Sequence, residues 1–275
     1  MGLENLSEDA LREMELWPLV ATRGVRMAPV ASIAREKPVA HAEPPSAAVR
    51  QPVDTYTRTE SLNARAEPSN PVVAREEPKP RTAAPAIGLG SADWQTLREQ
   101  VAGCVACGLC KQRKQAVFGV GSETGPWLFV GEGPGADEDA QGEPFVGQAG
   151  KLLDAMLAAI QLKRGRDTYI ANVVKCRPPG NRTPTLDEAD ACAAYLDRQI
   201  ELISPKIIVG LGKTAATRLL GHEASLASLR GKQHNYRGYP LVITYHPAYL
   251  LRNLPDKSKA WEDLLYARRI FAGAR

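Results

Sequence analysis

Four short apolar runs constrain the fold of this chain more than any other feature. They lie at residues 127–131 (WLFVG), 168–174 (TYIANVV), 206–211 (KIIVGL) and 239–244 (YPLVIT). Each run is nearly continuous rather than alternating, which is typical of strands that are buried on both faces of a parallel sheet. We therefore expect four central strands.

Helical patterns separate these runs. Apolar residues recur at helical spacing over residues 147–160, 185–203 and 212–220. Strands that alternate with helices indicate a parallel sheet with helices on both faces. The predicted fold is α/β, a three-layer α/β/α sandwich with a central, mostly parallel four-stranded sheet. Because such sheets bind ligands beyond the carboxyl ends of their strands, the loops that follow the strands should meet at one rim.

Proline restricts this domain to the later part of the chain. Residues 27–87 contain ten prolines and no apolar period of 2 or 3.6. Such a stretch buries too little apolar surface to offset its ordering entropy, so we interpret residues 27–88 as a disordered linker. Residues 1–26 contain a short helical pattern that could dock on the main domain or on another protein, or remain a weakly ordered terminus. Residues 89–275 are then the folded domain.

Charge and hydropathy narrow the class of protein. The net charge is −1 over residues 1–88 and +5 over residues 89–275. A basic surplus on the folded part suits an acidic partner such as nucleic acid, although ordinary solubility charge explains it equally well. No run of 18 apolar residues occurs, and the first 20 residues carry five carboxylates that a signal peptide would not tolerate. We expect a soluble protein of the bacterial cytosol.

Five cysteines in such a chain favour free thiols or a metal site over disulfides. Cys104 and Cys107 form a CxxC motif, and Cys176 and Cys192 flank a loop and the start of a helix. Four thiolates accept either Zn²⁺ or an iron–sulfur cluster, and spacing alone does not choose between them. Cys110 is a further nearby thiol. Unrelated buried cysteines are the alternative.

The loop GEGPGADEDAQGEPFVGQAG at residues 131–150 follows the first apolar run. Its glycines resemble a phosphate-binding turn, but no Lys, Ser or Thr lies between Gly131 and Glu138. A zinc-stapled nucleotide-binding protein, which would need such residues, is therefore disfavoured. Phe145 could supply a flat stacking face, with a core phenylalanine as the alternative.

Polar and bulky side chains follow two other runs. Asn172 presents a donor and an acceptor side by side, which matches the Watson–Crick edge of uracil and mismatches cytosine. His246 follows a strand end, where it could donate a hydrogen bond to developing negative charge. Tyr249, Leu250 and Leu251 come next and could wedge into a base stack. Asn172 and His246, each taken alone, are more often structural.

Together, four features resemble the family 4 uracil-DNA glycosylases, which carry a [4Fe–4S] cluster. They are the segments at residues 131–154, 172–184 (NVVKCRPPGNRTP) and 245–252 (YHPAYLLR), and the spacing of four cysteines. The resemblance covers about residues 92–270. It implies the uracil-DNA glycosylase fold, a catalytic domain over residues 89–275, and hydrolysis of the N-glycosidic bond of deoxyuridine in DNA during base excision repair.

The resemblance also implies roles for individual residues. The cluster ligands would be Cys104, Cys107, Cys176 and Cys192. Phe145 would stack on the flipped uracil and Asn172 would read its edge. His246 would stabilise uracil O2 as the bond breaks, and Glu138 would exclude the 5-methyl group of thymine. A non-catalytic DNA-binding or replication-associated module of the same fold is the alternative, but a pure binder has no need of all these groups.

Two further residues, Glu132 and Gly133, would line the catalytic pocket. Gly133 stands where the related family 1 enzymes carry an Asp that positions or activates water, so we expect a dissociative reaction in which water adds last. DNA contacts are expected from Tyr249, Leu250, Leu251 and Arg252. We further expect a monomer that acts on single- or double-stranded DNA, with residues 1–26 available to a protein partner.

Overall fold

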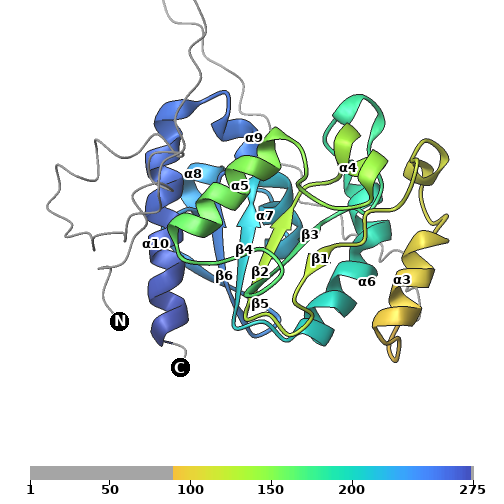
Figure 1. Cartoon of the computed structure of the whole chain (residues 1–275), viewed down its shortest axis with the longest axis horizontal. Coiled ribbons are helices and arrows are strands. Elements are labelled where there is room, and N and C mark those ends of the chain that lie inside the picture. The colour runs from red at the N-terminus through yellow and green to blue at the C-terminus, as the bar shows by residue number, and fades with distance from the viewer. Residues whose placement is uncertain (1–88, 274–275) are drawn as a thin grey trace, which may run out of the picture. The chain divides into compact units, whose positions relative to one another are not determined.

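The structure, a computed structural model, describes residues 89–273 (Figure 1). The predicted docking segment at residues 1–26 and the predicted linker at residues 27–88 lie outside the described residues. Helices and strands carry the labels of Figure 1.

A six-stranded sheet forms the centre of this domain, in the order β1-β3-β2-β4-β6-β5. Strands β2, β3, β4 and β6 are mutually parallel, whereas β1 and β5 join antiparallel at the two edges. The bounds are β1 Val120–Gly121, β2 Trp127–Gly131, β3 Thr168–Asn172, β4 Ile207–Leu211, β5 Gln233–Tyr236 and β6 Tyr239–Thr244. The four predicted parallel strands are confirmed as the centre of a larger sheet.

The two edge strands were missed for a physical reason. Strand β1 has only two residues, and β5 (QHNY) is polar and largely solvent-accessible. An edge strand pairs on one side only, so it needs no continuous apolar run. The apolar signal therefore reports the buried strands and not the full width of the sheet.

Eight α-helices surround the sheet within residues 89–273. Helices α5, α6 and α7 occupy the three helical patterns of the sequence. The bounds are α3 Trp94–Ala102, α4 Ala136–Gln141, α5 Gln148–Ala159, α6 Leu186–Ile203, α7 Gly212–Leu220, α8 Leu226–Leu229, α9 Pro247–Leu250 and α10 Lys257–Gly273. None of these helices combines the length and apolar composition that a membrane crossing requires.

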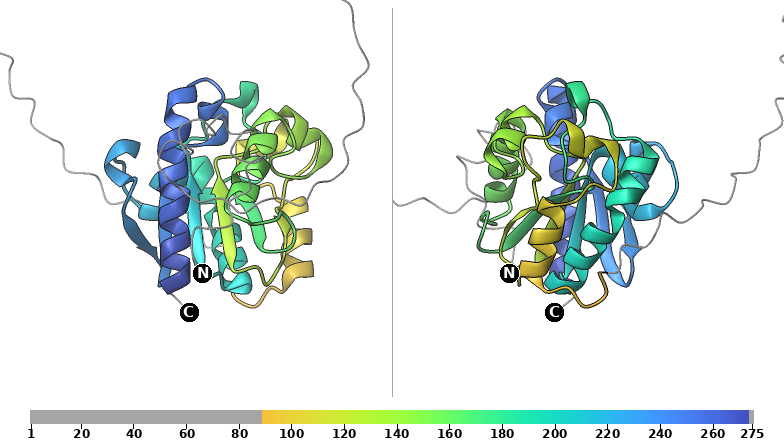
Figure 2. Two further views of the ribbon diagram at one scale, coloured as in Figure 1. Left: turned by 60° about the vertical axis from the view of Figure 1, so that its left-hand side comes forward. Right: turned by 90° about the vertical axis from the view of Figure 1, so that its right-hand side faces the viewer.

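Two apolar cores sandwich the sheet. Phe129 and Val209 face a core shared with α5, α9 and α10. Leu128 and Ile208 point the other way, into a core shared with α3, α6 and α7. Figure 2 shows α5 and α6 on opposite sides of the sheet. Neighbouring strand residues thus bury opposite faces, and the predicted three-layer α/β/α sandwich is confirmed.

Candidate active site

A cleft of about 470 Å³ lies at the carboxyl ends of the parallel strands. Residues after β2, at the end of β3 and after β6 line it, so the three predicted loops do meet at one rim. Six predicted base-contacting or catalytic residues line the cleft: Glu132, Gly133, Glu138, Phe145, Asn172 and His246. Their roles remain predictions, but the structure brings all six together.

Asn172 ends β3 with only 2% of its surface exposed. Its Oδ1 accepts no hydrogen bond from the described residues, although it is buried. A side chain at Gly131, its partner in β2, would collide with this oxygen and would lie 2.6 Å from the Phe145 ring. A buried acceptor without a donor among the described residues is costly, and a ligand that donates a hydrogen bond to Oδ1 would remove that cost.

Phe145 forms a wall of the cleft in an unusual conformation. Its φ is +57°, in the left-handed region, which costs a bulky residue about 1–3 kcal/mol. The ring centroid lies 5.4 Å from that of His246, and the two planes are inclined by 31°. Phe145 is also part of the apolar core, as one of the two alternatives for this residue predicts, and its role as a stacking face stays a prediction.

His246 is the N-cap of α9, and its Nδ1 accepts the backbone N–H of Ala248 at 3.2 Å. A backbone N–H can only donate, so the proton of the neutral ring lies on Nε2. Burial, assisted by the cation of Arg252 and opposed by Glu138, lowers the pKa of His246 to about 4. The ring is therefore neutral at pH 7 and offers one N–H for donation.

Glu138 is held rigidly by backbone donors. Its carboxylate accepts the N–H groups of Val146 at 2.9 Å, Gly147 at 3.1 Å and Gly135 at 3.0 Å. These bonds fold residues 131–147 around helix α4, which the glycine-rich sequence did not predict. The carboxylate of Glu138 thus bonds to Gly135 on one side of α4 and to Val146 and Gly147 on the other.

Glu132 accepts a hydrogen bond from the hydroxyl of Thr214 in α7. Sequence reasoning missed Thr214, because nothing in its helical pattern marks it as a partner of Glu132. Gly133 lies against Val174, where an added Cβ would be only 2.7 Å from the Val174 side chain. The backbone at Gly133 therefore leaves no room for a carboxylate without a shift.

The predicted DNA-contacting residues divide into two groups. Tyr249 and Arg252 line the cleft, and Tyr249 donates its hydroxyl to Asp256 at 2.7 Å. Leu251 is 42% exposed, whereas Leu250 is fully buried in the core beneath α5 and α10. The prediction that Leu250 inserts into DNA is wrong, because its side chain is already packed inside the protein. Leu251 is exposed and is followed directly by Arg252, which lines the cleft.

The loop after β3 adds residues that sequence reasoning did not single out. Pro178, Asn181, Arg182 and Thr183 line the cleft. Arg182 forms two hydrogen bonds, of 2.7 and 2.8 Å, with Glu188 and holds the pKa of that carboxyl at about 2. Its charge is thus engaged locally, whereas Arg252 forms no side-chain hydrogen bond or ion pair within residues 89–273.

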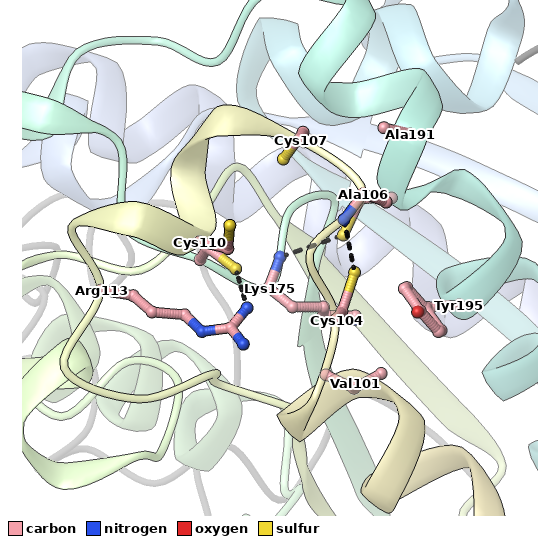
Figure 3. Close-up of a pocket in the computed structure, with 11 residues that line it drawn as sticks. Val101, Cys104, Ala106, Cys107, Cys110, Arg113, Lys175, Ala191 and Tyr195 are labelled. Atoms are coloured by element: carbon pink, nitrogen blue, oxygen red, sulfur yellow. Dashed lines mark hydrogen bonds between the residues drawn. The ribbon is translucent and has the colours of Figure 1, made fainter.

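All five cysteines line a second, smaller cavity, together with Arg113, Lys175 and Tyr195 (Figure 3). Three of them lie in residues 104–110, ahead of the sheet. Cys176 follows β3 and Cys192 lies in α6, so the cavity joins three separate segments. Cys110 shares the cavity with the four predicted ligands.

Several donors point at the sulfur atoms. The Arg113 guanidinium donates to Cys176 Sγ at 2.9 Å, and the backbone N–H of Lys175 donates to Cys192 Sγ at 3.3 Å. Burial raises the pKa of the Cys192 thiol to about 12 and also raises that of Cys176. Within residues 89–273 no three His, Cys, Asp or Glu side chains converge on one metal position. The thiols therefore surround a cavity rather than a single point.

Comparison with known proteins gives concordant matches. Residues 118–265 match the family model of the Uracil DNA glycosylase superfamily. The chain is 47% identical over 161 residues to a type-4 uracil-DNA glycosylase of Thermotoga maritima, covering 58% of this chain and 83% of that protein. Type-4 uracil-DNA glycosylases of Sulfurisphaera tokodaii and Pyrobaculum aerophilum are 42% and 43% identical, over 62% of this chain and 80% and 91% of their own lengths.

Proposed function

The chain belongs to the uracil DNA glycosylase superfamily, and on that premise we propose how its cleft removes uracil from DNA. It is a uracil-DNA glycosylase, a hydrolase that cleaves the N-glycosidic bond and leaves an abasic site for base excision repair. The single observation that carries the assignment to this cleft is the buried Oδ1 of Asn172, which accepts no hydrogen bond from residues 89–273 and lies beside Phe145 and His246.

The Asn172 amide supplies base selectivity. Uracil would donate its N3–H to the free Oδ1 and accept from the amide nitrogen through O4. Cytosine would place an acceptor against Oδ1 and a donor against the amide nitrogen, so both contacts would be lost. Phe145 would stack on the base, since its ring forms the adjacent wall of the cleft.

His246 would act on the leaving group. Its Nε2–H, fixed by the Ala248 contact on Nδ1, would donate to uracil O2 as the bond lengthens and negative charge builds on the base. One donor of this kind contributes roughly 3 kcal/mol to transition-state stabilisation. A neutral ring needs no proton transfer to perform this role.

Water would add to the sugar after the bond has lengthened. Gly133 offers no carboxylate, which favours a dissociative path with an oxocarbenium-like sugar. The nearest acidic side chain along the chain is Glu132, which Thr214 anchors in the cleft. We assign it the orientation of that water.

Glu138 would exclude thymine. Three backbone N–H groups hold its carboxylate, so it cannot swing aside to admit a 5-methyl group. The apolar methyl group would also desolvate the charge without a compensating hydrogen bond.

The DNA would lie across the rim beside α9. Flipping the nucleotide costs a few kcal/mol of unstacking, and an exposed apolar side chain that fills the gap offsets part of it. Leu251 would take this role in place of the buried Leu250, while the guanidinium of Arg252, which pairs with no side chain within residues 89–273, suits a phosphate. Tyr249 completes this rim.

The cysteine cavity fits a [4Fe–4S] cluster. Each thiolate of such a cluster binds a different iron atom, so thiols spread around a cavity suit it better than a single metal ion. We propose Cys104, Cys107, Cys176 and Cys192 as the ligands, with hydrogen bonds from Arg113 and Lys175 compensating sulfur charge. When bound, the cluster would crosslink three segments of the chain.

We propose that the protein acts on DNA in the cytosol as a monomer, with any protein partner contacting residues 1–26.

Release of the base tests the function directly. The full chain is incubated with oligonucleotides of one sequence that contain a single uracil, thymine, cytosine or hypoxanthine. We expect free uracil and an alkali-labile abasic site from the uracil substrate, and no release of thymine or cytosine. Intact uracil DNA after prolonged incubation with iron-loaded protein would contradict the proposal.

A further inference from the structure

Arg164, in the loop between α5 and β3, uses its whole guanidinium fork on three acceptors. Nη1 donates to the carbonyl oxygen of Pro144 and Nη2 to that of Phe145, both at 2.9 Å. Nε donates to the carboxylate of Asp154 in α5 at 2.8 Å. We refer to Arg164 with these three acceptors as the Arg164 clamp.

The Arg164 clamp binds the backbone of Phe145, the residue with the left-handed conformation. Phe145 is held at a φ of +57°, which bulky side chains rarely adopt. Its carbonyl group is fixed on two sides, by Arg164 and by Gly150 in α5, where an added Cβ would collide with the carbonyl oxygen. The backbone is therefore anchored behind the ring, while the ring itself lines the cleft.

We propose that Arg164, oriented by Asp154, is a positioning residue that sets the stacking face of Phe145 for the flipped uracil. This inference rests on the proposed function. Arg164 does not line the cleft and so acts only through Phe145. Without the clamp, Phe145 can return to an ordinary φ, and its ring leaves the position that it holds against His246.

An ordinary surface ion pair would not have this geometry. Asp154 is half exposed, and an exposed pair alone contributes little to stability. The two hydrogen bonds to carbonyl oxygens are different, because three separate nitrogens of one planar guanidinium donate in fixed directions to two adjacent carbonyl groups and a carboxylate. The clamp is specific for arginine rather than for positive charge.

A matched pair of substitutions tests the clamp. Arg164→Ala removes it, whereas Arg166→Ala removes the same charge from the same loop, where Arg166 pairs with Asp167 and is 68% exposed. The affinities of each variant for free uracil and for DNA with a preformed abasic site are measured. We expect Arg164→Ala to weaken uracil binding roughly tenfold, the scale of one base–aromatic stack, with unchanged affinity for abasic DNA. Arg166→Ala should change neither.

Two further variants separate positioning from folding. Arg164→Lys keeps the charge but not the fork, and it should recover little uracil affinity. In a Phe145→Ala background, Arg164→Ala should cause no additional loss, because the clamp then has nothing to position. Full recovery by lysine, an additive loss, or parallel losses of uracil and abasic-DNA affinity would each overturn the proposal.

Wild-type cleavage of uracil DNA is measured in the same series. If the wild type cleaves and Arg164→Ala binds uracil normally, the clamp alone is wrong. If the wild type neither cleaves uracil DNA nor binds uracil, both the proposed function and this inference are wrong.

Discussion

The cleft and the cysteine cavity contrast in how far the protein completes them by itself. In the cleft, backbone donors fix Glu138 and His246, and a buried acceptor without a hydrogen bond from residues 89–273, Asn172 Oδ1, is where a base would bind. In the cavity, the sulfur atoms surround a space without converging on one point. The cleft is thus held in place by the protein's own hydrogen bonds, whereas under our proposal a bound cluster completes the cavity.

The largest expected effect is the loss of bound iron when a proposed cysteine ligand of the cavity is replaced. Cys192→Ser should abolish bound iron and sulfide, because burial at this position disfavours a charged replacement ligand and the crosslink between α6 and residues 104–107 is lost. Metal content and visible absorbance measure this. Cys110→Ser, in the same cavity, is the matched control and should retain iron. The ligand assignment fails if Cys110→Ser loses the iron and Cys192→Ser keeps it.

Removal of the leaving-group donor should affect the cleft alone. His246→Ala should lower the single-turnover cleavage rate by about 10²–10³-fold, the range for loss of one preorganised donor, with little change in DNA affinity. Rapid-quench cleavage and fluorescence anisotropy on the same oligonucleotide measure the two quantities. Equal losses in both would make His246 a binding residue only. Iron content should match that of the wild type.

Substitutions of the adjacent residues Leu250 and Leu251 distinguish a core residue from an exposed residue. Leu250→Ala should lower the free energy of unfolding by about 2–5 kcal/mol, because it leaves a cavity in the core. Leu251→Ala should change it by less than about 0.5 kcal/mol but slow the cleavage of duplex DNA. Denaturant unfolding and duplex cleavage assays separate the two. A stability loss confined to Leu251→Ala would reverse our assignment.

The smallest expected effect is the pH dependence that His246 gives to cleavage and to stability. An ordinary histidine pKa is near 6.5, but burial lowers that of His246 to about 4, with Arg252 acting in the same direction and Glu138 against it. The neutral donor therefore persists as the pH falls through 6.5 and is lost only near pH 4. Between these values the unfolded chain binds more protons, so His246 makes stability fall as the pH falls. An inflexion of kcat/KM near pH 6.5 that disappears in His246→Ala would contradict this.

The sequence predicts the features that local patterns determine, and it does not predict those that depend on tertiary packing. The apolar runs predict the four parallel strands, because each must be buried on both faces, and strand ends with polar residues predict the shared rim. The sequence did not predict edge strand β5, because this polar strand has no apolar run. Phe145 was predicted as a stacking face, yet its left-handed backbone and the Arg164 contacts behind it depend on tertiary packing.

The leucine pair marks the limit most clearly. Leu250 and Leu251 are chemically identical neighbours in the same motif, and only the orientation of α9 against α5 decides which one is buried. Likewise, the fold and not any local motif brings Thr214 to Glu132 and the loop at residues 178–183 to the cleft. Spacing identifies candidate residues, and packing decides which way their side chains face.

The central claim is that the cleft recognises uracil through Asn172, Phe145 and His246. The most direct measurement is a crystal structure of the iron-loaded protein with free uracil. We predict the base stacked on Phe145, with N3 and O2 within about 2.7–3.2 Å of Asn172 Oδ1 and His246 Nε2, respectively. Uracil bound elsewhere, or bound in the cleft without the Asn172 contact, would contradict the account.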